Sequence, residues 1–276
     1  MMRVFAELAA EHIEADLQVA TQRHELAARV NSVLSSDSIA LVYQPIFELK
    51  HARIVGFESF ARFTATPVRS PAAWFADAEA VGLDVELEMK VIDRALASFA
   101  KLPAGAYVTF NVSPNIVLNG KLGRAFAGAP LERIVLEINE HLTFREYDEI
   151  AKALAPLREQ GLRTSVDETG AGISSFRHIV CLKPDVVKLN MSLTRGIDTD
   201  VAKRAIACSV IQFARDHKIE LIAEGVETAA ELKALRSIGV MRAQGYLLGR
   251  PAPLATAVAL CERHQVSQDR RMVQAA

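Results

Sequence analysis

The chain is poor in the residues that build disulfide frameworks and zinc sites. Its 276 residues include only three cysteines, Cys181, Cys208 and Cys261, which are widely spaced and form no CxxC pair. The seven histidines form neither an HxH nor an HExxH pattern. These absences argue against a disulfide scaffold, a zinc knuckle and a zincin-type site, and they indicate a protein of the reducing cytoplasm.

The chain also lacks an excess of either charge and a long apolar run. Its 32 Lys and Arg residues against 33 Asp and Glu residues give a formal net charge of −1, which provides no basic surface for duplex nucleic acid or an anionic membrane. Charged residues such as Glu7 and Glu11 interrupt the N-terminal segment, so we expect neither a signal peptide nor a membrane span. A small polar substrate fits this composition better.

Residues 5–34 contain no glycine or proline, and their apolar residues recur at roughly helical spacing. This pattern predicts one long helix. Because the spacing drifts from a strict heptad, a helix lying on the next domain is favoured over a coiled coil. We therefore expect a helical connector at residues 1–36, through which a sensory partner could act, a barrel domain at 37–265 and a frayed tail at 266–276.

Strand and helix patterns alternate after this segment. Two runs rich in β-branched and aromatic residues, 39–47 and 53–63, lie too close together for a helical crossover and should form an antiparallel hairpin. Further strands are predicted within 106–112, 133–139, 162–168, 185–190, 219–226 and 240–246. Helices are predicted at 71–81, 85–100, 120–128, 144–160, 174–181, 199–217, 228–238 and 253–264. The pattern predicts a TIM-like (β/α)8 barrel with an antiparallel first strand. The lack of an early GxGxxG loop disfavours an open doubly wound sheet.

Polar and acidic residues gather where the predicted strands end, which is the face at which barrel enzymes carry their reactive groups. They are Glu58, Asn111, Glu137, Glu140, Asp167, Glu168, Lys188, Glu224, Glu227 and Gln244. Carboxylates that converge on one barrel mouth repel one another, and divalent cations would compensate them. Ligands that are all oxygen atoms indicate Mg²⁺ or Mn²⁺, and a pair of such ions would suit phosphodiester cleavage.

Each of these residues also has a purely structural interpretation. Glu58 could face solvent, and Asn111 could serve only to turn the chain. The acidic pair at 167–168 could cap the next helix. Glu137 and Glu140 differ by three positions, so in a strand they point to opposite faces and one of them could be structural.

Lys188 is harder to explain as a surface residue, because apolar residues flank it in its predicted strand. A lysine is rarely buried without a carboxylate partner. Glu224 or Glu227 could supply that carboxylate, and a structural salt bridge remains the alternative to a catalytic role.

Taken in their order along the chain, these motifs resemble the EAL family of bacterial cyclic di-GMP phosphodiesterases. The resemblance runs from about residue 40 to about residue 260, and Glu58-Ser59-Phe60 stands where Glu-Ala-Leu gives the family its name. The other matching segments are YQPIF, NVSP, LEINE, DETGAG, KLN, EGVE and QGYLLGRP. The resemblance implies a metal-dependent hydrolysis of one phosphodiester of cyclic di-GMP to linear pGpG in second-messenger signalling, performed by a homodimer.

The resemblance also implies metal and substrate contacts. The first metal ion would be bound by Glu58, Asn111, Glu137 and Asp167, and the second by Asp167, Glu168 and Glu224. Gln44 and Arg62 match positions that contact the dinucleotide, and the guanidinium of Arg62 suits a phosphate oxygen.

Further roles are implied for residues around the metal ions. Lys188 would orient the attacking water, and Glu224 would be the general base. Glu227 and Gln244 would support this arrangement, and Glu140 would steady the loop that follows the acidic pair.

The chain departs from the family pattern close to the expected site. Glu168 replaces the usual second aspartate and adds one methylene, while Asn190 replaces an aspartate and removes a charge near Lys188. The main prediction is a phosphodiesterase, and the alternative is a receptor that binds cyclic di-GMP without hydrolysis and signals through its N-terminal helix or dimer interface. A protein-interaction module without nucleotide is disfavoured by Gln44 and Arg62.

Overall fold

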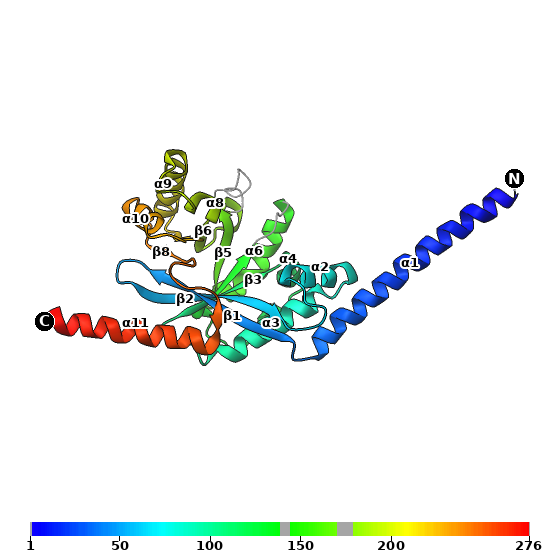
Figure 1. Cartoon of the computed structure of the whole chain (residues 1–276), viewed down its shortest axis with the longest axis horizontal. Helices are drawn as coiled ribbons and strands as arrows, with labels where there is room; N and C mark the ends of the chain where they lie inside the picture. Colours follow the sequence, from blue (N-terminus) through cyan, green and yellow to red (C-terminus); the bar gives the residue numbers. More distant parts are fainter. Residues whose placement is uncertain (1, 139–143, 170–178, 276) are drawn as a thin grey trace. The chain divides into compact units, whose positions relative to one another are not determined.

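The computed structural model of the chain describes residues 2–138, 144–169 and 179–275 (Figure 1). The chain divides into two compact units, one made of Met1–Ala40 with Ala61–Val91 and the other of Leu41–Phe60 with Ile92–Ala276. Among the helices in the described ranges, none combines the length and the apolar character that crossing a bilayer requires.

The first unit is built around the end of the predicted N-terminal helix. Its helices are α1 (Met2–Ser35), α2 (Pro71–Val81) and the first part of α3 (Asp84–Phe99). Val33 and Trp74 are fully buried in the cluster that joins them. The ammonium of Lys90 donates hydrogen bonds to the carbonyls of Val33 and Ser36, at 3.3 and 2.7 Å. These bonds serve carbonyls at the end of α1, where the helix itself offers no partner.

The closed barrel that the sequence predicts lies in the second unit, except for the start of its first strand, residues 39–40, and the end of its second strand, residues 61–63. Its strands are β1 (Ile39–Glu48), β2 (Arg53–Phe63), β3 (Tyr107–Val112), β4 (Ile134–Ile138), β5 (Arg163–Thr169), β6 (Val186–Leu189), β7 (Glu220–Ala223) and β8 (Arg242–Ala243). Successive strands from β2 to β8 are parallel, and β1 pairs antiparallel with β8 and closes the ring against β2. A short strand that the sequence did not predict, β9 (Ala252–Pro253), pairs antiparallel with β1.

Helices connect most of the strands, close to the predicted ranges. They are α4 (Pro114–Leu118), α5 (Leu122–Ala125), a 3-10 turn at Leu131–Arg133, α6 (Phe144–Arg158), α8 (Met191–Thr194), α9 (Val201–Asp216), α10 (Ala229–Ser237) and α11 (Leu254–Ala275). The single-turn helices α4 and α8 were not predicted, because so short a segment has no periodic pattern. Helix α11 continues well past its predicted end near residue 264. A further predicted helix, 174–181, falls mostly outside the described residues, and the division into connector, barrel domain and tail remains a prediction.

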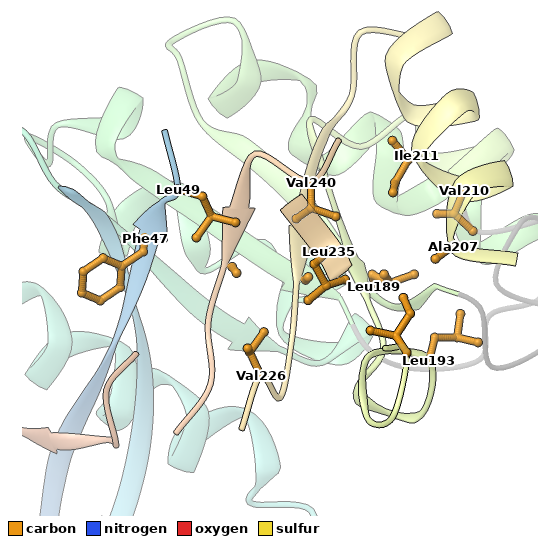
Figure 2. Packing of buried hydrophobic residues seen from close by; sticks show 13 residues of the cluster. Phe47, Leu49, Leu189, Leu193, Ala207, Val210, Ile211, Val226, Leu235 and Val240 are labelled. Carbon is orange, nitrogen blue, oxygen red and sulfur yellow. The ribbon is translucent and has the colours of Figure 1, made fainter. Parts of the chain in front are cut away.

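A hydrophobic cluster fixes the later barrel strands against their helices (Figure 2). It consists of Phe47, Leu49, Leu189, Leu193, Ile197, Ala207, Val210, Ile211, Ala223, Val226, Leu235, Val240 and Ala243. Most of these residues belong to β1, β6, β7 and β8 and to α8, α9 and α10, and the others, Leu49, Ile197, Val226 and Val240, lie in the loops that follow β1, α8, β7 and α10. The cluster therefore holds the ends of the strands that carry Lys188, Glu224 and Gln244.

The interior of the barrel changes from apolar to polar along the strands. A buried layer comprises Ile46, Tyr107, Val135, Val186 and Ile222. Residues of five separate strands can meet only inside the ring, and side chains two positions further along a strand point the same way. Glu137, Lys188 and Glu224 occupy those positions beyond this layer. Gly56 makes room for the layer, because a Cβ atom there would lie 2.7 Å from the Tyr107 ring.

Candidate functional site

Lys188 lies at the centre of an acidic cluster at the carboxyl ends of the barrel strands. Its side chain is 1% exposed, and its ammonium lies 2.8 Å from Glu58, 2.5 Å from Glu137 and 3.1 Å from Glu224. Strands β2, β4 and β6 and the residue after β7 supply these groups. An ammonium among three carboxylates offsets part of their mutual repulsion and of the cost of burying them.

Two amide side chains tie the carboxylates together. Gln244, which follows β8, donates from Nε2 to Glu58 Oε2 at 2.6 Å and to Glu224 Oε1 at 3.1 Å. Asn111 at the end of β3 donates to Glu58 Oε1 at 3.2 Å. The Oε1 atom of Gln244 is buried and accepts no hydrogen bond from the described part of the chain. A buried acceptor of this kind fits a site that also takes a water molecule or a cation.

The chemistry of this cluster fits a hard divalent cation. Carboxylate oxygens from Glu58, Glu137 and Glu224, with the amide of Asn111, form the oxygen-only set that Mg²⁺ and Mn²⁺ prefer. The ammonium of Lys188 already lies among these carboxylate oxygens, so their position accommodates a positive charge. In the ranges described, no three His, Cys, Asp or Glu side chains are placed to hold an ion directly. The glutamates are arranged around the lysine instead.

Strand β5 brings the predicted metal ligands Asp167 and Glu168 to the same end of the barrel. Their main chain is described, whereas their side chains and Glu140 lie outside the description. The pairing of β5 with β6 shifts register between Val166 and Thr169. Such irregularities are common beside active sites, where they redirect side chains. The roles of these three acidic residues remain predictions.

Three other predicted site residues make contacts outside the lysine cluster. Glu227 is exposed and forms an ion pair with Arg195, which follows α8. Gln44 is buried on β1 and donates from Nε2 to the carbonyl of Gly249 at 3.1 Å. Arg62 belongs to the first unit, is exposed, and donates to the carbonyl of the residue before it at 2.8 Å. Their proposed roles remain predictions.

Glu231, which the sequence analysis did not single out, holds the loop between β7 and α10. Its buried carboxylate accepts main-chain hydrogen bonds from Gly196 at 2.9 Å, Glu227 at 3.0 Å and Thr228 at 2.9 Å. Burial raises the pKa of this carboxyl, but the hydrogen bonds lower the pKa further, so it lies below its ordinary value. The signal was present in the sequence, since Thr228 and Glu231 form a capping box at the start of α10.

These features define a (β/α)8 barrel in which the first strand is antiparallel to the others and the strand ends carry a cluster of glutamates around one buried lysine. Residues 27–251 of the chain match the EAL domain family. The chain belongs to this family.

Relatives and solved structures give the family context. The protein named "Probable cyclic di-GMP phosphodiesterase PdeD" of Escherichia coli is 30% identical over 242 residues, which cover 84% of this chain and 45% of that protein. The EAL enzyme Bd1971, solved with cAMP and cyclic di-GMP bound, superposes with a TM-score of 0.79 at 23% identity, over 94% of this chain and 74% of that one. BlrP1 of Klebsiella pneumoniae, solved with calcium and cyclic di-GMP, has a TM-score of 0.70 at 29% identity, over 79% and 57% of the two chains. The chain spans less than half the length of the curated relatives it matches, for example 35% of a protein of Azorhizobium caulinodans.

Proposed function

We propose that the chain is a metal-dependent phosphodiesterase that hydrolyses one phosphodiester bond of cyclic di-GMP to linear pGpG. The observation that carries this proposal is the enclosure of the Lys188 ammonium by Glu58, Glu137 and Glu224 at 2.5–3.1 Å. Burying that much charge is costly, and such arrangements are common where a site performs chemistry. The substrate is supported by the relative named "Probable cyclic di-GMP phosphodiesterase PdeD" and by the cyclic di-GMP complex of BlrP1.

The proposed cofactor is Mg²⁺ or Mn²⁺, as a pair of ions. The first ion would be held by Glu58, Asn111, Glu137 and Asp167, and the second by Asp167, Glu168 and Glu224. The structures of BlrP1 with calcium and with manganese support a divalent cation. When bound, the ions would stabilise the charge on the phosphoryl oxygens and make a water molecule more acidic.

The chain's own residues would position the reacting groups and move the proton. Glu224 is the most exposed of the three glutamates, at 15% of its side chain, and it would accept the proton of the attacking water. Gln244 would hold Glu224 and Glu58 in a fixed relation through its amide. Lys188 would orient the water through its ammonium, and Glu227 would support the arrangement.

The proposed substrate contacts and protein partners follow from the resemblance to the family. Gln44 and Arg62 would contact the dinucleotide, with the guanidinium of Arg62 on a phosphate oxygen. We propose a homodimer, with α1 as the connector to a sensory partner.

Asn190 favours a second candidate, a receptor that binds cyclic di-GMP without hydrolysing it. Its Oδ1 accepts a hydrogen bond from the main-chain N–H of Ser192 at 2.8 Å and thereby caps α8. The residue two positions after Lys188 therefore serves the fold and brings no charge to the site. Together with the longer side chain of Glu168, this change could leave binding intact while turnover is lost.

The test is hydrolysis of cyclic di-GMP by the purified chain with Mg²⁺ or Mn²⁺, followed by chromatography. We expect pGpG from the wild type and a loss of about 100-fold or more in Glu58→Gln. Glu149→Gln, which alters an exposed carboxylate paired with Arg145 on α6, is the matched control and should keep full activity. Binding of cyclic di-GMP without product would establish the receptor instead. Absence of both binding and product would contradict the proposed function.

A further inference from the structure

Lys188 and a divalent cation would compete for the same carboxylate oxygens. The ammonium contacts Glu58, Glu137 and Glu224, all three of which are proposed metal ligands. We infer that Lys188 is the resident cation of the metal-free site, and that metal binding requires its ammonium to withdraw from Glu58 and Glu137. The lysine would thereby set the affinity of the site for Mg²⁺ or Mn²⁺. This inference rests on the proposed function, because it takes these glutamates as metal ligands.

Charge and burial support a competition between the two cations. Three carboxylates share one ammonium, so the described cluster keeps an excess of negative charge that a divalent ion would neutralise more fully. Glu58 and Glu137 have side chains that are 5% and 1% exposed, so water screens them little. Two cations against the same buried oxygens would repel each other strongly. Simultaneous full contact by the lysine and the ion is therefore unfavourable.

Within the cluster, the ammonium of Lys188 has an alternative position beside Glu224 alone. A lysine side chain has a flexible four-carbon stem, so its charge can move while the strand stays in place. Glu224 is the most exposed of the three partners and lies on the outer side of the cluster, after the end of β7. An ammonium that kept Glu224 and released Glu58 and Glu137 would free the deepest oxygens for the ion. It would also stay near the proposed general base.

The competition predicts two measurable effects of replacing Lys188, one on stability and one on metal affinity. Replacing Lys188 by a neutral residue should leave the three carboxylates without their described cation, which should lower the stability of the metal-free protein. The same replacement should strengthen metal binding, because the competing charge is gone. If Lys188 only supported the fold or only oriented water, its replacement would lower stability or activity. It would not strengthen metal binding.

The experiment compares the affinity for Mn²⁺ of the wild-type chain, Lys188→Met and Lys188→Gln, by electron paramagnetic resonance of free Mn²⁺ and by calorimetry. We expect the Kd to fall by about tenfold or more in both variants, the size of effect that one neighbouring charge has on a site. The melting temperature without metal should fall, and Mn²⁺ should raise it more than in the wild type. Lys90→Met is the matched control, because this lysine donates to main-chain carbonyls of the first unit and should leave the Kd unchanged.

The outcomes separate this inference from the proposed function. A Kd that is unchanged or higher in both Lys188 variants would overturn the competition. If Lys188→Met does not fold without metal, Lys188→Gln decides, since glutamine keeps N–H donors for the carboxylates. Metal-dependent hydrolysis by the wild type together with an unchanged Kd in the variants would contradict the competition and leave the proposed function intact. No Mn²⁺ binding by the wild type or by either variant would sink the competition and the proposed metal-dependent enzyme together.

Discussion

Glu231 provides a sharp test of how the loop that carries Glu224 is held in place. One carboxylate oxygen of Glu231 accepts from Gly196, and the other accepts from Glu227 and Thr228. Substitution Glu231→Gln replaces one oxygen by an NH₂ group, which cannot accept a hydrogen bond. The best orientation of the amide keeps the pair of bonds from Glu227 and Thr228 and turns the NH₂ group toward the N–H of Gly196.

The expected cost follows from these contacts. A main-chain hydrogen bond to a charged group contributes about 1.5–3 kcal/mol, and the same bond to a neutral group contributes about 1 kcal/mol. The variant loses one charged bond and weakens the others, while the smaller cost of burying a neutral amide offsets part of the loss. We expect the free energy of unfolding to fall by about 2 kcal/mol. For a chain of this size that corresponds to roughly 4 °C in melting temperature.

The pH dependence of this difference has a definite sign. Burial raises the pKa of Glu231, but the main-chain hydrogen bonds lower it more, so the pKa in the folded protein lies below its ordinary value of 4.5. The unfolded chain therefore binds more protons in acid than the folded one. The stability that the carboxylate contributes is fully present above the unfolded pKa and is lost as the pH falls through the folded pKa. The difference between wild type and Glu231→Gln should thus be constant near neutrality and shrink below 4.5.

The assay is urea unfolding of both proteins at several pH values between neutral and acid, followed by circular dichroism. Fluorescence would report on the wrong part of the chain, because the single tryptophan, Trp74, belongs to the first unit and Glu231 to the second. Glu149→Gln serves as the control for removing an exposed carboxylate. A difference below about 0.5 kcal/mol near neutrality, the usual scatter of surface substitutions, would refute the reasoning. A difference that persists unchanged in acid would refute the part played by the charge.

Two glycine substitutions test the packing inside and beside the barrel. Gly56→Ala should lower the free energy of unfolding by about 1–3 kcal/mol, because its Cβ would lie 2.7 Å from the Tyr107 ring, whereas Gly105→Ala meets nothing within 4 Å. Equal melting temperatures of the two variants would contradict the close packing. Gly245→Ala should cost more than about 4 kcal/mol, because Gly245 has a φ of +155° and its Cβ would lie 2.2 Å from the main-chain nitrogen of Val226. Recovery of a variant with the wild-type melting temperature would rule out this loop geometry.

The architecture was largely predictable, because its signals are local. The short gap between the first strands excludes a helical crossover and predicts the antiparallel hairpin of β1 and β2. The later alternation of apolar runs and helical patterns predicts the parallel strands. The elements that were missed have weaker local signals. Helix α8 is a single turn capped by Asn190, and β9 consists of two residues, Ala252 and Pro253, that are a strand only through their pairing with β1.

The residues of the site could be named from the chain because parallel strands bring their carboxyl ends to one face of the barrel. The side-chain contacts between these residues could not be predicted from the chain. Lys188 and Glu58 are 130 positions apart, and their contact depends on the register and closure of the ring. Sequence spacing left Glu224 and Glu227 as equal candidates for the lysine, whereas the folded loop directs Glu224 to Lys188 and Glu227 to Arg195. Alternation along a strand tells which side chains point inward, but which charges meet across the barrel is decided by the tertiary packing of several strands at once.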